Sequence, residues 1–210
     1  MPVFLKDGRA VLFVHVPKAG GTSLERLFGK SGWTMHLRAS RRSDPDTFDL
    51  IRCSPQHYHA TLLGELLHLD RFDARFLVVR DPIARFRSEY VMRHGANARN
   101  AAPQVLSWWR WARARYDEDP FVHDNHLRPQ AEFLLPDAEV YRLEDGLERV
   151  VADLNARFDL GLEGRLPRAS HSRRVGVSSD DVEVSPVLAA ELADFYRADY
   201  ERFGYPLPTG

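Results

Sequence analysis

The residues best suited to chemistry lie in a short segment that follows an apolar run near the N-terminus. The segment reads HVPKAGGTSL, from His15 to Leu24. Its two adjacent glycines allow the backbone to approach a ligand closely, and the amides at the start of a following helix would point at that ligand. Lys18 adds a positive charge, and Thr22 and Ser23 add hydroxyl donors. This combination predicts a site for an anion such as a phosphate or a sulfate.

The order of the residues in this segment argues against a magnesium-dependent nucleoside triphosphatase. In the P-loop pattern G-x-x-x-x-G-K-[ST] the lysine follows the glycines, whereas Lys18 precedes them. The strand expected to end at Arg80 is followed by Asp81, which we expect to cap a helix rather than to hold magnesium.

A second motif, VVRDPIARFRSEY, runs from Val78 to Tyr90. Arg80 is expected at the carboxyl end of a strand, which is the edge at which ligands bind in open α/β sheets. Ser88 lies two turns into the next helix, three residues after Arg85, so these two residues share a helix face. An arginine that binds through two hydrogen bonds, together with a serine hydroxyl, predicts a receptor for a separate phosphate.

Two histidines form the third candidate group. His57 and His59 lie in the segment CSPQHYHA, which follows a strand expected at about Asp49 to Cys53. Histidine suits a general base at neutral pH because its ordinary pKa is about 6.5. We favour His57 as the base because it lies nearer to the end of that expected strand, and we expect His59 to orient it, to replace it, or to cap the next helix.

A zinc site is the rival use of His57 and His59, with His123 and His126 as further ligands. Zinc sites combine histidine with cysteine or carboxylate ligands at recurring spacings, and the sequence has no cysteine or acid at such a spacing. We therefore expect no metal.

The elements that must position these residues follow from the apolar pattern. Ala10 to Val16 is a nearly continuous apolar run, typical of a strand buried on both faces of a parallel sheet. The other expected strands are Asp49 to Cys53, Arg75 to Arg80 and Glu139 to Arg142; the expected helices are Leu24 to Phe28, Ala60 to Leu69, Pro82 to His94, one from Pro103 onward, Leu147 to Phe158 and Pro186 to Phe203. The alternation predicts an α/β fold with an open parallel sheet flanked by helices.

Two further segments, a tryptophan-rich helix and a long irregular stretch, carry predictions about packing and order. Trp108, Trp109 and Trp111 lie in the helix expected after Pro103, and their helical spacing favours packing over sugar binding. Leu166 to Ser179 is a long irregular stretch, which predicts either a functional lid or a disordered segment.

Composition places limits on the partners. The chain has 210 residues and a formal net charge of −1, which fits one domain over residues 1–210 and gives no global charge for binding nucleic acid or a membrane surface. Cys53 is the sole cysteine, so no internal disulfide can form. No apolar stretch approaches the roughly 20 residues needed to span a bilayer, and the N-terminal segment lacks the features of a secretory signal. We expect a cytoplasmic protein without an integral membrane segment.

The two motifs resemble the signatures of the PAPS-dependent sulfotransferases (PAPS is 3′-phosphoadenosine 5′-phosphosulfate). They are most similar to the branch that contains the carbohydrate 2-O- and chondroitin/dermatan-type enzymes and their bacterial relatives. DNHLRPQAEFL, from Asp124 to Leu134, and YRADYERFGY, from Tyr196 to Tyr205, also resemble segments of this branch. The resemblance implies the sulfotransferase fold related to P-loop nucleotide kinases. It also implies in-line transfer of a sulfuryl group from PAPS to a hydroxyl of a carbohydrate or glycoconjugate, with adenosine 3′,5′-bisphosphate as product and no metal.

The resemblance also implies roles for individual residues. The first motif would bind the 5′-phosphosulfate through Lys18, Ala19, Gly20, Gly21, Thr22 and Ser23. The second would bind the 3′-phosphate through Arg80 and Ser88. His57 and His59 are the candidate catalytic bases, and Lys18 would stabilise the leaving phosphate. The alternatives are a P-loop-type small-molecule kinase and a nucleotide-binding relative without catalytic activity.

Overall fold

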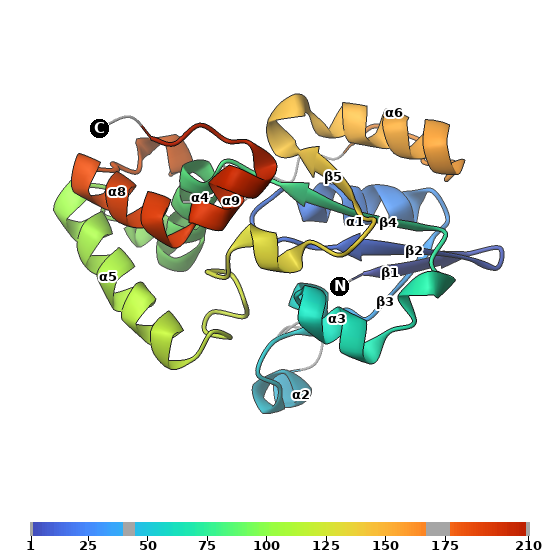
Figure 1. The fold of residues 1–210 in the computed structure, drawn as a ribbon, viewed down its shortest axis with the longest axis horizontal. Helices are drawn as coiled ribbons and strands as arrows, with labels where there is room; N and C mark the ends of the chain where they lie inside the picture. Colours follow the sequence, from blue (N-terminus) through green and yellow to red (C-terminus); the bar gives the residue numbers. More distant parts are fainter. Residues whose placement is uncertain (1, 40–44, 167–176, 209–210) are drawn as a thin grey trace. The chain divides into compact units, whose positions relative to one another are not determined.

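The computed structural model describes residues 2–39, 45–166 and 177–208. The chain divides into two compact units. The sheet unit comprises Met1–Val79 and Glu132–Ala169, and the helical unit comprises Arg80–Ala131 and Ser170–Gly210. Each unit therefore combines two segments that are distant in sequence, and the chain enters the helical unit directly after a strand (Figure 1).

The sheet has five described strands in the order β3-β1-β2-β4-β5. Strands β2, β4 and β5 are parallel, whereas β1 is antiparallel to both β2 and β3. The strands are β1 Val3–Lys6, β2 Arg9–Val14, β3 Thr34–His36, β4 Ala74–Val79 and β5 Glu139–Arg142. The expected α/β fold with a parallel sheet is confirmed at the centre of the sheet, and the antiparallel edge formed by β1 and β3 was not predicted.

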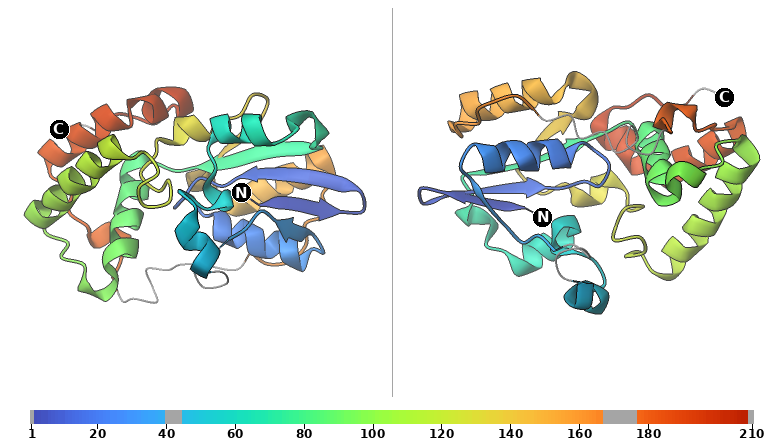
Figure 2. Two further views of the ribbon diagram at one scale, coloured as in Figure 1. Left: turned by 90° about the horizontal axis from the view of Figure 1, so that it is seen from below. Right: turned by 180° about the vertical axis from the view of Figure 1, so that it is seen from behind.

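Helices cover both sides of this sheet. Helices α1 and α6 share one apolar core with the sheet, and α3 lies on the other side (Figures 1 and 2). The described helices of the sheet unit are α1 Gly21–Lys30, α2 Pro45–Leu50, α3 Ala60–Leu66 and α6 Leu147–Phe158. The short 3₁₀ helix η1, Pro55–His57, precedes α3.

The packing of α1 decides where the first motif lies. Leu24, Leu27 and Phe28 are fully buried and recur at the spacing of one helix face. Phe28 stacks on Phe4 of β1, with ring centroids 4.1 Å apart. Burial of each such side chain contributes about 1.5–3 kcal/mol, so the first turn of α1 is held firmly at the carboxyl end of β2.

The helical unit has its own core. Its described helices are α4 Pro82–His94, α5 Ala102–Glu118, α8 Pro186–Phe195 and α9 Arg197–Phe203. Trp109 is buried in a cluster with residues of α4 and α8, and Trp108 packs against that cluster. Trp111 is 48% exposed. The prediction that these tryptophans serve packing is therefore confirmed for Trp108 and Trp109.

Several predicted elements are confirmed closely. The strand Glu139–Arg142 and the helices Pro82–His94 and Leu147–Phe158 have the bounds that the sequence predicted. The expected helix Pro186 to Phe203 is instead two helices that meet at Tyr196, whose φ of −98° and ψ of 21° interrupt the α conformation. Residues 167–176 of the irregular stretch lie outside the described residues.

The strand expected at about Asp49 to Cys53 is wrong. Residues 45–50 form α2, and residues 51–53 are bends. Leu50 is 86% exposed, and Cys53 is the one buried residue of Asp49 to Cys53. This short stretch therefore lacks the alternating buried side chains that would hold it in the sheet. His57 consequently lies in η1 and not after a strand.

Candidate functional site

The first motif forms a tight loop between β2 and α1. Lys18 and Gly20 both have left-handed backbone conformations, with φ of 68° and 86°. A non-glycine residue in this region is uncommon, and such outliers cluster at functional sites. Successive amides in a loop that contains left-handed residues form a concave surface suited to an anion.

The start of α1 favours an anion as well. Gly20 is the N-cap residue; within the described part of the chain no side chain caps this first turn, and the turn contains no acid. The first amides of a helix have no partner within the helix, and the helix dipole attracts negative charge there. The loop and the helix start therefore create a positive environment at the end of β2.

A larger residue is disfavoured at both glycines of the loop, at Gly20 by its positive φ together with a close side chain and at Gly21 by a close side chain alone. A Cβ atom on Gly20 would lie 2.8 Å from Cδ1 of Leu143, and one on Gly21 would lie 2.7 Å from Nε2 of His15. Contacts this short do not occur between real Cβ atoms and their neighbours. The loop thus fits a ligand that binds against backbone.

The remaining residues of the motif differ in burial. Ala19 and Ser23 are buried, Lys18 is half-buried and Thr22 is exposed. The exposed hydroxyl of Thr22 and the half-buried Lys18 are accordingly the side chains of this loop best able to meet a ligand from solvent.

A buried histidine–glutamate pair beside this loop was missed by the sequence analysis. His15 follows β2, and its Nδ1 donates a hydrogen bond of 2.6 Å to Oε1 of Glu25 in α1. Burial raises the pKa of Glu25, but the charge and hydrogen bond of His15, with the charges of Arg38 and His57, lower it more, so the net pKa is below 4.5. An acid on the apolar face of α1 was the signal that could have revealed this pair.

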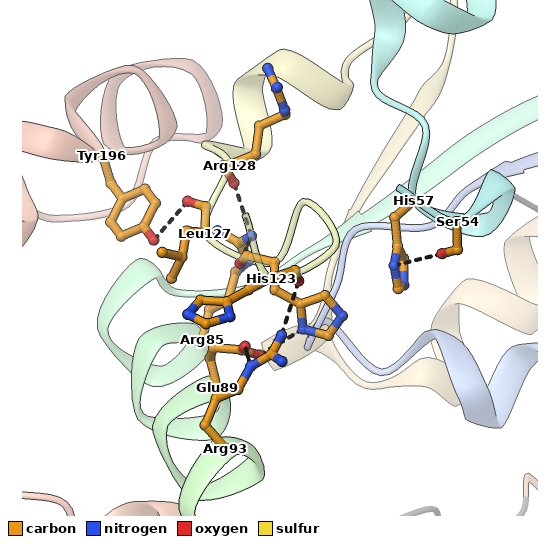
Figure 3. Close-up of polar contacts among 10 residues, drawn as sticks. Ser54, His57, Arg85, Glu89, Arg93, His123, Leu127, Arg128 and Tyr196 are labelled. Atoms are coloured by element: carbon orange, nitrogen blue, oxygen red, sulfur yellow. Dashed lines mark hydrogen bonds and ion pairs between the residues drawn. The ribbon is translucent and has the colours of Figure 1, made fainter. Parts of the chain in front are cut away.

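The structure places His57 next to this pair. His57 is buried at the end of η1, and its Nδ1 is hydrogen-bonded to Oγ of Ser54 at 3.2 Å (Figure 3). Its ring meets the ring of His15 edge-on, with centroids 5.3 Å apart. His59 is also buried and is the N-cap residue of α3. Of the two candidate bases, His57 is therefore the one in ring contact with the residue that leads into the glycine loop.

The second motif opens the helical unit. Arg80 directly follows β4, and both Arg80 and Ser88 are partly buried. Asp81 is the N-cap of α4, where its side chain accepts a hydrogen bond of 2.8 Å from the amide of Ala84, as expected. Pro82 occupies the first turn, where its missing N–H has no cost.

Arg85, which lies three residues before Ser88 in α4, contacts the backbone of another segment. It is almost completely buried, and its Nη2 donates to the carbonyl oxygens of His126 at 2.8 Å and of Arg128 at 2.9 Å (Figure 3). Arg85 therefore holds the DNHLRPQ segment against α4.

This segment has an unusual backbone. His123, Asp124 and Asn125 are three consecutive residues with positive φ, at 56°, 59° and 62°. Each such residue costs about 1–2 kcal/mol unless its surroundings compensate. The carbonyl of His123 accepts a hydrogen bond of 2.9 Å from Arg93 (Figure 3). The side chain of Asn125 accepts one of 3.0 Å from Arg128.

A buried glutamate of α4 completes the support of this turn. Glu89 accepts hydrogen bonds from Arg93 at 2.5 Å and from Nδ1 of His126 at 2.7 Å. Burial raises the pKa of Glu89, but the charges and hydrogen bonds of His126 and Arg93 outweigh it and lower the pKa far below 4.5. Burial and the charge of Arg93 lower the pKa of His123 to about 4, so His123 is neutral at pH 7.

The fold and the loop together define a class. A parallel sheet that feeds a glycine loop and a helix N-terminus is the architecture of α/β proteins that bind nucleotides and other phosphate compounds. The chain belongs to the sulfotransferase family, whose family model matches residues 1–206. The protein is therefore a transferase of the sulfuryl-transferring kind. Neither the comparison with curated proteins nor the comparison with solved structures found a match. No helix within the described residues has the length and apolar character to span a membrane.

Proposed function

We propose that this sulfotransferase uses PAPS as its donor and transfers the sulfuryl group to a hydroxyl of a carbohydrate or glycoconjugate. The loop of the first motif carries the donor part of this proposal. Lys18 and Gly20 have left-handed backbones at the start of α1, and added Cβ atoms on Gly20 and Gly21 would clash with the side chains of Leu143 and His15. Such a loop suits a bound phosphosulfate.

Lys18 and the first amides of α1 have the chemical character that the reaction needs. Negative charge develops on the departing phosphate during sulfuryl transfer, and fixed positive groups at that position lower the barrier. The half-buried ammonium of Lys18 and the helix amides would stabilise this charge. We propose that the reaction proceeds without a metal.

We assign the 3′-phosphate to Arg80 and Ser88. Arg80 lies at the carboxyl end of β4, where ligands bind in open α/β sheets. Arg85 cannot serve this purpose without losing its two bonds to the backbone of the DNHLRPQ segment.

We assign the general base to His57 and a supporting role to His59. The ring contact of His57 with His15 brings it to the start of the glycine loop. A base must lie within hydrogen-bond reach of the acceptor hydroxyl, and Ser54 holds the ring of His57 in one orientation. The carbohydrate acceptor is supported by the resemblance of both motifs to the carbohydrate branch of the family.

Calorimetric titration tests the donor. We expect adenosine 3′,5′-bisphosphate to bind far more tightly than AMP or ATP. Arg80→Ala should weaken the binding of the bisphosphate by roughly ten- to a hundredfold, because a hydrogen bond to a charged group contributes about 1.5–3 kcal/mol. AMP affinity should change by less than about twofold in the same variant.

Arg113→Ala is the matched control, since Arg113 is a partly exposed arginine of the same unit and pairs with Asp117 at 2.9 Å. This variant should leave both affinities unchanged. Equal binding of ATP and the bisphosphate would contradict the proposal, and magnesium-dependent ATP binding would favour the kinase alternative.

A further inference from the structure

The backbone of Arg80 is held by a side chain that comes from 50 residues further along the chain. The parallel ladder between β4 and β5 ends at the pair Val79 and Arg142. At the next residue, the N–H of Arg80 donates to Oε1 of Gln130 at 2.9 Å, and Nε2 of Gln130 donates to the carbonyl oxygen of Arg80 at 2.7 Å. One side-chain amide thus replaces the strand partner at the point where the sheet ends.

Gln130 is itself firmly placed. It is completely buried and begins the 3₁₀ helix η4, Gln130–Phe133. The amide of the next residue, Ala131, donates a hydrogen bond of 2.8 Å to Oδ1 of Asp199 in α9. Burial raises the pKa of Asp199, and the charge of Arg85 with hydrogen bonds from Ala131 and Gln130 offsets part of that effect.

The chain that leads to Gln130 is fixed at several points. Arg85 donates to the carbonyl oxygens of His126 and Arg128, and the hydroxyl of Tyr196 donates to the carbonyl oxygen of Leu127 at 2.9 Å (Figure 3). Three successive carbonyl groups before Gln130 therefore have buried side-chain donors. A buried polar network of this kind is rigid when its members are satisfied.

We propose that Gln130 is a positioning residue for the 3′-phosphate of the nucleotide, that it acts through the backbone of Arg80, and that Asp199 holds Gln130 in place. This inference rests on the proposed role of Arg80. It gives a function to two segments, DNHLRPQAEFL and YRADYERFGY, that the donor site itself does not explain.

The physical reason is the geometry of the arginine. Only Arg80 and Asp81 join the last residue of β4 to the first residue of α4. The backbone of Arg80 sets the direction in which its side chain leaves the chain, and a guanidinium binds a phosphate through two bonds only when its plane is correctly aimed. Loss of the Gln130 clamp frees both backbone groups of Arg80, so the arginine must be ordered anew each time it binds.

The test compares two ligands in four proteins by calorimetric titration: the unaltered chain, Gln130→Met, Arg80→Ala and the double variant. Methionine has nearly the shape of glutamine but lacks both hydrogen-bonding groups. We expect Gln130→Met to weaken the binding of adenosine 3′,5′-bisphosphate by roughly ten- to thirtyfold, since two bonds worth about 1 kcal/mol each are lost. AMP affinity should stay within about twofold. In the Arg80→Ala background the same substitution should change neither affinity, because Gln130 acts only through the side chain that Arg80→Ala has removed.

Tyr90→Phe is the matched control. It removes a partly buried hydrogen bond of 2.6 Å from the same unit, donated by the hydroxyl of Tyr90 to the carbonyl oxygen of Arg99. Tyr90→Phe should lower the melting temperature without a selective loss of affinity for the bisphosphate. If Gln130→Met does not fold, Gln130→Glu replaces it, because glutamate keeps the acceptor for the Arg80 amide and loses the donor to the Arg80 carbonyl.

The outcomes separate this inference from the proposed function. Equal weakening of AMP and the bisphosphate by Gln130→Met, or an undiminished effect in the Arg80→Ala background, overturns the role of Gln130 alone. A selective loss of bisphosphate affinity in Tyr90→Phe also overturns the role of Gln130. If Arg80→Ala itself fails to discriminate between the two ligands, the proposed 3′-phosphate site is wrong.

Discussion

Alanine at Gly21 should destabilise the protein through the buried pair beside it. A Cβ atom there would lie 2.7, 2.8 and 2.9 Å from the Nε2, Cε1 and Cδ2 atoms of His15. The ring has little room to move, because Glu25 holds its Nδ1 at 2.6 Å and because it packs between the rings of Phe13 and His57. The clash is therefore relieved by breaking the bond between His15 and Glu25 or by shifting the start of α1.

The expected loss of stability follows from breaking the hydrogen bond between His15 and Glu25. Removing the partner of a buried ionised group costs about 3–5 kcal/mol, and a charged hydrogen bond contributes about 1.5–3 kcal/mol. We expect Gly21→Ala to lower the free energy of unfolding by about 3 kcal/mol, which corresponds to a melting temperature lower by roughly 6–12 °C for a chain of this size.

Gly29→Ala provides a control in the same helix. Apart from its chain neighbours and the backbone of its own helix, no atom of the described residues lies within 4 Å of the Cβ atom that this substitution would add. Alanine is about 1 kcal/mol more favourable than glycine inside a helix. Gly29→Ala should therefore raise the free energy of unfolding by up to about 1 kcal/mol.

Urea denaturation followed by circular dichroism measures both variants against the unaltered chain. Opposite signs for the two substitutions support the reasoning. A Gly21→Ala protein that unfolds at the same urea concentration as the unaltered chain would refute it, because the His15 ring would then have room that the structure denies it.

The remaining predictions concern the base, the metal and one buried acid. His57→Ala should bind the bisphosphate normally but turn over at least roughly a hundred times more slowly, and His59→Ala should lose less; a nearly normal His57→Ala beside an inactive His59→Ala would contradict this. Activity should survive excess EDTA, because Lys18 and the α1 amides supply the positive field; loss of activity that magnesium restores would count against it. Glu89→Gln should cost about 3–5 kcal/mol of stability at pH 7. Because the pKa of Glu89 in the folded protein is depressed, this stabilisation is complete above pH 4.5 and is lost at lower pH. The difference in urea midpoint between the unaltered chain and Glu89→Gln should therefore narrow below pH 4.5. A difference that stays constant with pH would be evidence against the ion pair.

Elements with strong local signals were predictable. The helix Pro82–His94 has a capping aspartate and a proline at its start, and both act as expected. The strand before it is an apolar run long enough to be buried on both faces. These signals depend on residues a few positions apart, so no knowledge of the tertiary structure was needed.

Elements that depend on distant partners were not predictable. Strands β1 and β3 have four and three residues, and each becomes a strand only because a neighbour in the sheet supplies its hydrogen bonds. The reverse error occurred before His57, where a short apolar stretch suggested a strand. Leu50 in that stretch is exposed, and the choice between strand and helix was decided by whether the sheet had a place for it.

The candidate site divides in the same way. The glycine loop is visible in the sequence because its conformation depends on adjacent residues. Glu25 and Gln130 escaped notice because each acts on a residue elsewhere: Glu25 on His15 ten positions before it, and Gln130 on Arg80 fifty positions before it. A buried acid on an apolar helix face and a buried amide between irregular segments are costly unless they are paired. Burial of an unexplained polar side chain is thus the observation that identifies such supporting residues, and it requires the folded structure.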